Sequence, residues 1–77
     1  MTTVNGEPYA PAAGETVLDL VATRTGRPLG PDGRPLDGGR LGMAVAVDLA
    51  VLPRGRWAAT PVTEGDRIDI VTAVQGG

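Results

Sequence analysis

Cysteine, histidine and lysine are all absent from this 77-residue chain, and each absence excludes a type of chemistry. Without cysteine there is no disulfide, no thiolate nucleophile and no thiolate metal ligand. Without histidine the usual general base is missing, and without lysine no Schiff base can form. Nine acidic side chains, the hydroxyls and the C-terminal carboxylate remain. We therefore predict a partner-dependent protein that is not an enzyme, with no metal site and no cofactor of its own.

Aromatic residues are almost as scarce, because the chain has only Trp57 and Tyr9. Two aromatics are too few for a base-stacking platform, and a net charge of −2 gives no basic surface for phosphates, so we expect no nucleic-acid partner. No stretch approaches the roughly 18 apolar residues of a membrane span, and no basic segment followed by an apolar run marks a signal peptide. We expect a cytoplasmic protein that does not bind membranes.

The N-terminal segment has the pattern of a β-hairpin. Asn5-Gly6 lies between two short strand-like segments, and an Asn-Gly pair suits a type I′ turn in which both residues have positive φ. We predict strands at residues 2–5 and 7–10. Pro8 has no N–H, so it must face outward from the sheet or lie at an irregular point.

A single helix is predicted at residues 16–25. Thr16 is a favourable N-cap, Asp19 can complete a capping box with it, and Gly26 is a plausible C-terminal stop. Apolar residues at the i, i+3 and i+4 positions of one helical face are Val17, Leu20 and Val21.

Residues 26–42 are dense in glycine and proline and have neither helical nor strand periodicity. We predict a long flexible surface loop. A loop of this length in a compact domain is either functional or disordered. We favour the interpretation that it is a tolerated insertion without a function.

The remaining chain alternates short strands with turns. We predict a strand at 43–48, a short strand and one irregular helical turn within 51–57, and a final strand from 67 to 74. Trp57 is expected to be a core anchor. Several strands and one helix predict an α+β domain over residues 1–74, with the helix packed on one face of a sheet.

The motifs that carry a family resemblance run along nearly the whole chain except residues 26–42. They are Val4-Asn5-Gly6-Glu7, Ala13-Gly14-Glu15-Thr16-Val17, Ala46-Val47-Asp48, Val51-Leu52-Pro53-Arg54 with Trp57, Glu64-Gly65-Asp66 and Val74-Gln75-Gly76-Gly77. Together they resemble the ThiS family of sulfur carriers in thiamine biosynthesis. The resemblance implies the ubiquitin-like β-grasp fold, a mixed four- to five-stranded sheet with one main helix, in which the first strand pairs in parallel with the last.

The resemblance also implies a function for the C-terminal carboxylate of Gly77. An activating enzyme that uses ATP would adenylate it, and sulfur from a persulfide donor would replace AMP to form a thiocarboxylate. The charged carrier would then donate this sulfur to thiazole synthase. Two rival functions share the fold and the tail: the small subunit of molybdopterin synthase and a ubiquitin-like protein modifier. A plain binding domain with inert terminal glycines is a third alternative.

The tail, residues 75–77, is predicted to be flexible and thin. Glycine has no Cβ, so Gly76 and Gly77 suit entry into a narrow enzyme channel. Gln75 is bulkier and is expected either to set the depth of entry or to contact the channel wall. If Ile68 and Ile70 face the helix, Val71 and Ala73 face away from it, where they are either an apolar surface for a partner or buried in an ordinary core. The predicted partner-binding residues are Gly76, Gln75, Val74, Ala73 and Val71.

Overall fold

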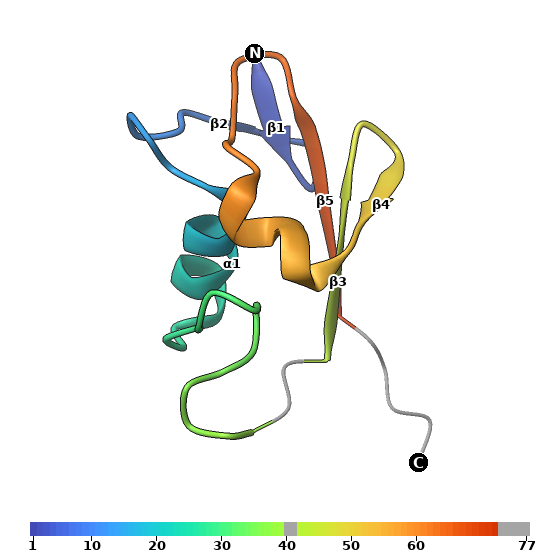
Figure 1. The fold of residues 1–77 in the computed structure, drawn as a ribbon. Coiled ribbons are helices and arrows are strands. Elements are labelled where there is room, and N and C mark those ends of the chain that lie inside the picture. The colour runs from blue at the N-terminus through green and yellow to red at the C-terminus, as the bar shows by residue number, and fades with distance from the viewer. Residues whose placement is uncertain (40–41, 73–77) are drawn as a thin grey trace.

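A computed structural model describes residues 1–39 and 42–72, so residues 73–74 of the predicted last strand and the predicted tail, residues 75–77, lie outside this range. Figure 1 shows one sheet with the helix on one side of it. The elements in chain order are β1 (Thr2–Val4), β2 (Glu7–Tyr9), α1 (Val17–Thr25), β3 (Met43–Val47), β4 (Ala50–Leu52), the 3-10 helix η1 (Arg54–Ala59) and β5 (Arg67–Thr72).

The sheet has five strands in the order β2-β1-β5-β3-β4, which places the last strand in its centre. Strand β5 pairs in parallel with β1 and antiparallel with β3, so the sheet is mixed. The predicted α+β architecture and the parallel pairing of the first and last strands are both confirmed. The chain that follows Thr72 therefore starts from a strand that is paired on both sides.

The N-terminal hairpin forms as the Asn-Gly pair predicts. Asn5 and Gly6 have φ angles of 52° and 82°, and the strands that flank them pair antiparallel. Asn5 also links β1 to β5, because its side-chain oxygen accepts a hydrogen bond from the Ile70 N–H at 2.7 Å. Pro8 lies in β2, an outermost strand of the sheet, where a missing N–H costs no ladder hydrogen bond.

Helix α1 begins and ends at the predicted signals. The Thr16 hydroxyl accepts a hydrogen bond from the Asp19 N–H at 3.2 Å, and the Asp19 carboxylate accepts one from the Thr16 N–H at 3.0 Å. Gly26 ends the helix in the left-handed conformation, with φ 69°. Both caps satisfy backbone groups that have no partner within the helix, so a helix this short is stabilised locally at each end.

The hydrophobic core lies between α1, the sheet and η1. Trp57 of η1 is 1% exposed, and its indole N–H donates to the Leu52 carbonyl at 3.1 Å. The predicted role of Trp57 as a core anchor is confirmed. The buried apolar residues are Val4, Val17, Leu20, Val21, Val45, Trp57, Val62 and Ile68.

Within the glycine- and proline-rich insertion, residues 28–36 fold back on themselves. The Gly30 N–H donates to the Arg34 carbonyl at 2.8 Å, and the Leu36 N–H donates to the Pro28 carbonyl at 3.0 Å. The predicted flexibility of residues 26–42 as a whole stays a prediction. The hydrogen bonds nevertheless give this part of the insertion a defined turn structure.

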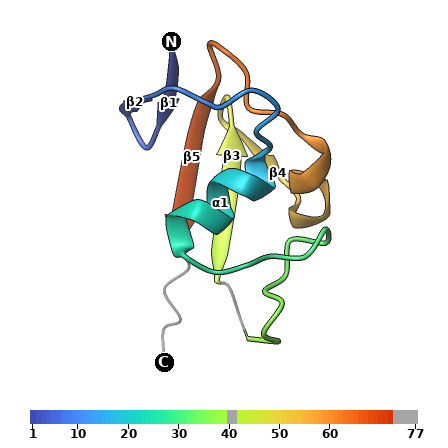
Figure 2. The ribbon, with the colours of Figure 1, turned by 90° about the vertical axis from the view of Figure 1, so that its left-hand side faces the viewer.

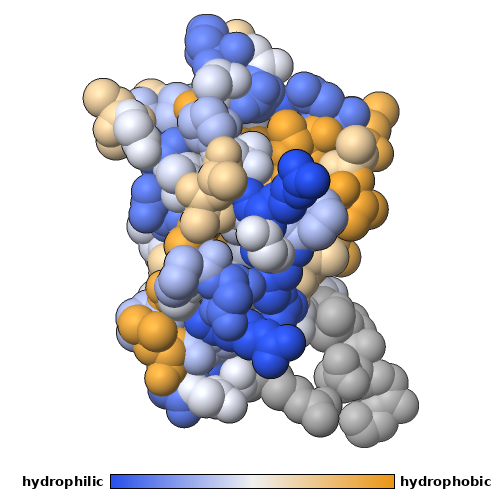
Figure 3. Space-filling view, viewed as in Figure 1, coloured by the Kyte–Doolittle hydropathy of each residue, from blue (hydrophilic) through white to orange (hydrophobic). Residues whose placement is uncertain are grey.

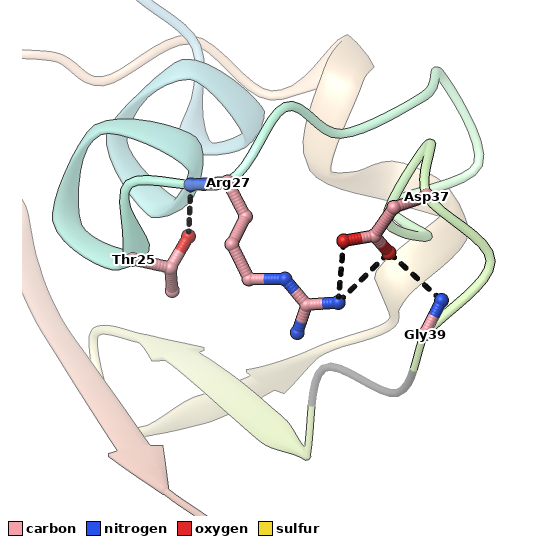
Figure 4. Close-up of polar contacts among 4 residues, drawn as sticks. All are labelled: Thr25, Arg27, Asp37 and Gly39. Atoms are coloured by element: carbon pink, nitrogen blue, oxygen red, sulfur yellow. Dashed lines mark hydrogen bonds and ion pairs between the residues drawn. The ribbon is translucent and has the colours of Figure 1, made fainter.

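An ion pair closes the ends of this turn (Figure 4). The Arg27 guanidinium donates to both carboxylate oxygens of Asp37, at 3.0 and 3.3 Å, and the Gly39 N–H donates to the same carboxylate at 2.8 Å. Hydrogen bonds from the Gly39 N–H, which has the larger effect, and from the Arg27 guanidinium hold the pKa of Asp37 below its ordinary value of 3.8. The carboxylate therefore joins the end of α1 to the far side of the insertion.

The depressed pKa of Asp37 predicts how this closure responds to acid. Because the pKa of Asp37 is lower in the folded state, the ionised carboxylate stabilises the fold fully at pH values above its ordinary pKa. This stabilisation is lost as the pH falls through the folded-state pKa. We expect the NMR shift of the Gly39 amide to titrate with a midpoint below 3.8. Arg27→Ala should raise that midpoint, whereas Arg34→Ala should leave it unchanged. A midpoint at or above the ordinary value in the unmodified protein would contradict the closure.

Candidate functional site

The candidate site is the end of β5, where the strand leads into the tail. Thr72 pairs there with Met43, the first residue of β3, so the base of the tail lies beside the start of a neighbouring strand. The five remaining predicted site residues lie outside the residues that the structure describes: Ala73, Val74, Gln75, Gly76 and Gly77. Their roles stay predictions.

Val71 is the predicted site residue that the structure places. Its side chain is 59% exposed, whereas Ile68 on the opposite face of β5 is fully buried. The strand alternation therefore points Val71 away from α1, as predicted. An apolar side chain that contributes little to the core is thus held next to Thr72, the last residue of β5.

Val71 belongs to a group of apolar residues on the sheet face that α1 does not cover. Ala44 pairs with Val71 across β3 and β5, and Ala46 pairs with Val51 across β3 and β4. Val51 is 78% exposed. We call Ala44, Ala46, Val51 and Val71 the free-face patch. Figure 3 shows apolar residues gathered over β4 and the adjoining turn.

Sequence reasoning identified Val71 in this patch but missed Val51. The alternation in β5 extends over six residues and distinguishes its two faces, whereas β4 has only three residues, too few to assign a face by pattern. The pairing of Ala46 with Val51 shows that β4 belongs to the sheet, with the Val51 side chain on its exposed face.

The charged groups near the patch are paired with each other. The Arg67 guanidinium donates to the Asp69 carboxylate at 3.1 Å, at the end of β5 farther from the tail. An exposed ion pair of this kind contributes little to stability. Within the part of the chain that the structure describes, no three acidic, cysteine or histidine residues are placed to hold a metal ion. What the described residues present here is the exposed apolar free-face patch.

A second surface feature is an open hollow of about 360 Å³ at the other end of the sheet, lined by Met1, Pro8, Tyr9, Ala10 and Glu64. The Tyr9 hydroxyl donates to the Glu15 carboxylate, and this hydrogen bond raises the pKa of Tyr9. Because Thr3 of β1 pairs with Arg67, the hollow is next to the start of β5 and away from the tail. It is not part of the candidate site.

Nearly the whole chain matches a known protein family. The sequence model of the ThiS family matches residues 2–77, including the terminal glycine pair. The chain belongs to the ThiS family. No match was found among curated proteins. ThiS-family proteins are small β-grasp sulfur carriers of the thiamine or molybdopterin type, and they are carriers and not enzymes.

Membership of the ThiS family explains the arrangement of the site. A carrier interacts in turn with an activating enzyme and with a synthase. Of these, the structure describes the end of β5, from which the chain continues toward its terminus, and the free-face patch on β3, β4 and β5. Among residues 1–39 and 42–72, no helix has the length and apolar character needed to cross a bilayer.

Proposed function

We propose that this ThiS-family protein carries sulfur for the thiazole ring of thiamine on the C-terminal carboxylate of Gly77. The observation that carries the proposal is that the family match extends through the terminal glycines. The folded domain presents the chain end, and the chemistry belongs to partner enzymes. ATP is consumed by the activating enzyme, so the carrier itself needs no cofactor. We also place this function in the cytoplasm.

The proposed chemistry explains how a chain without cysteine can carry sulfur. The α-carboxyl is ionised at neutral pH, with a pKa of about 3.3–3.7, and resists nucleophiles. One of its oxygens attacks the α-phosphorus of ATP, and pyrophosphate leaves. The terminal sulfur of a persulfide then attacks the acyl carbon, and AMP leaves. A thiol reduces the resulting acyl disulfide and releases the thiocarboxylate, which thiazole synthase accepts as its sulfur source.

The residues before Gly77 have a steric role in this proposal. Gly76 and Gly77 have no Cβ, so the chain end fits a channel too narrow for larger residues. Gln75 contacts the channel wall. Val71 of the free-face patch, together with Ala73 and Val74, forms the contact with the activating enzyme and the synthase.

Intact mass of the protein from its native cells tests the chemistry directly. We expect a fraction of the protein to be heavier by the difference between one sulfur and one oxygen, located by fragmentation at Gly77. Treatment of purified carrier with the activating enzyme, ATP and a persulfide donor should produce the same change. No ATP-dependent pyrophosphate release with that enzyme, and no mass change in cells, would refute the proposal.

A molybdopterin-type carrier is the second candidate, because ThiS-family membership covers both types. A carrier of that type forms a stable complex with the large subunit of molybdopterin synthase. Co-purification with that subunit, in place of thiazole synthase, would favour the second candidate. Higher-mass conjugates on a denaturing gel would instead indicate a protein modifier.

A further inference from the structure

The insertion between α1 and β3 lies at the same end of the molecule as the base of the tail. It runs from Arg27 to Gly39 and returns to β3, whose first residue, Met43, pairs with Thr72. Figures 1 and 2 show that this segment extends past the end of the sheet in the direction in which β5 runs. Any enzyme that takes up the tail must therefore accommodate the segment at the mouth of its channel.

The segment packs against η1 at one glycine. Gly33 is buried with φ 79°, and a Cβ added there would lie 2.2 Å from Cγ of Arg54 and 2.8 Å from its carbonyl oxygen. Arg54 is itself held in place. Its guanidinium donates to the Met43 carbonyl at 3.1 Å and lies over the Trp57 ring, 5.5 Å from the centroid. The same arginine thus supports the segment and the start of β3.

This packing places one large apolar side chain in water. Leu36 is 69% exposed, although its backbone N–H is bonded to the Pro28 carbonyl and the preceding Pro35 is buried. A single exposed leucine is ordinary on a protein surface. Leu36 differs because it stands between Pro35, which is buried, and Asp37, which is ion-paired. It also lies in the segment beside the base of the tail. A side chain on a backbone that is already ordered by hydrogen bonds adds no cost of ordering the loop when it binds, which favours its use as an anchor.

We propose that residues 27–39 form a recognition loop whose Leu36 enters an apolar recess of the activating enzyme. The inference rests on the proposed function. It adds the contact by which the activating enzyme would distinguish this carrier from other carriers. A glycine-ended tail is common to all carriers of this kind, so the tail by itself distinguishes none of them. Selection before ATP is consumed then requires a contact on the folded domain. Of the two alternatives for residues 26–42, the structure thus favours the functional loop.

Steady-state pyrophosphate exchange with the activating enzyme from the same organism tests the contact. Leu36→Glu should lower kcat/KM about tenfold through a higher KM for the carrier, the effect of losing one apolar anchor. The kcat at saturating carrier and the urea midpoint should not change, because Leu36 is exposed. Leu49→Glu is the matched control: Leu49 is 72% exposed, but it lies in the β3–β4 turn at the opposite end of β3.

A pair of glycine variants tests whether the packing of the loop matters. Gly33 and Gly38 have nearly equal φ angles, 79° and 82°, so alanine is similarly strained at both. Only at Gly33 would the new Cβ collide with Arg54, since nothing lies within 4 Å of it at Gly38. We expect Gly33→Ala to raise KM several-fold more than Gly38→Ala does.

The possible outcomes separate this inference from the proposed function. Normal exchange kinetics with Leu36→Glu would overturn the recognition loop and leave the carrier function intact. No exchange with the unmodified protein would instead overturn the carrier function. A defect only in sulfur transfer from pre-charged carrier to the synthase would assign the loop to the synthase, and the proposal as stated would be wrong.

Discussion

Adding one residue after Gly77 is expected to abolish thiocarboxylate formation while the domain stays folded. The added residue moves the reactive carboxylate by about 3.5 Å, and a misplacement of about 1 Å can already cost about a hundredfold in rate. Replacing Gly77 with a bulky residue should have a similar effect, because the side chain would obstruct a channel shaped for glycine. Pyrophosphate exchange and intact mass with the activating enzyme measure both changes.

The matched control adds the same residue before Met1. Met1 lies near Glu64, which precedes the start of β5, so this extension is at the end of the sheet away from the tail. It should be charged at the normal rate. Normal charging of the C-terminally extended protein, with mass spectrometry showing the extension still present, would refute the role of Gly77.

Trp57→Ala is expected to remove a large share of the free energy of unfolding. Removing a buried aromatic side chain costs about 3–5 kcal/mol, and a domain of this size has a free energy of unfolding of about 4–12 kcal/mol. The substitution also removes the hydrogen bond to the Leu52 carbonyl and the ring beneath Arg54. Urea unfolding followed by far-UV circular dichroism would measure the loss, since the only tryptophan fluorophore is gone.

Two further variants calibrate this prediction. Trp57→Phe keeps an aromatic ring in the core but loses the N–H donor, so its cost should lie between those of the unmodified protein and Trp57→Ala. Val51→Ala alters a side chain that is 78% exposed and should change the free energy of unfolding by less than about 0.5 kcal/mol. Equal stabilities of Trp57→Ala and Val51→Ala would contradict the assignment of Trp57 as the core anchor.

Local features of the fold could be predicted because their causes are local. Asn5-Gly6 determines a turn through its φ angles, and Thr16 with Asp19 determines a helix start through hydrogen bonds three residues apart. Trp57 could be assigned to the core from its size. The roles of the tail residues rest on chemistry and family membership, and they are predictions that the described structure does not test.

Non-local features could not be read from the pattern. The insertion has no periodicity, so nothing in its sequence indicated that Gly33 packs on Arg54, 21 positions further along the chain. The exposure of Val51 likewise depends on which strand β4 pairs with, and three residues are too few to indicate that. Both features bear on partner binding, and both arise from contacts between distant segments.

The sequence by itself determined the turn, the helix and its caps, the order of the elements and the absence of the chemistry of cysteine, histidine and lysine side chains. Those properties depend on residue type and on spacing within a few positions. Only the tertiary structure decided that Val51 and Leu36 are left in water, and that Leu36 belongs to the segment beside the base of the tail. Exposure is set by which distant segments pack together, and that is a property of the whole fold.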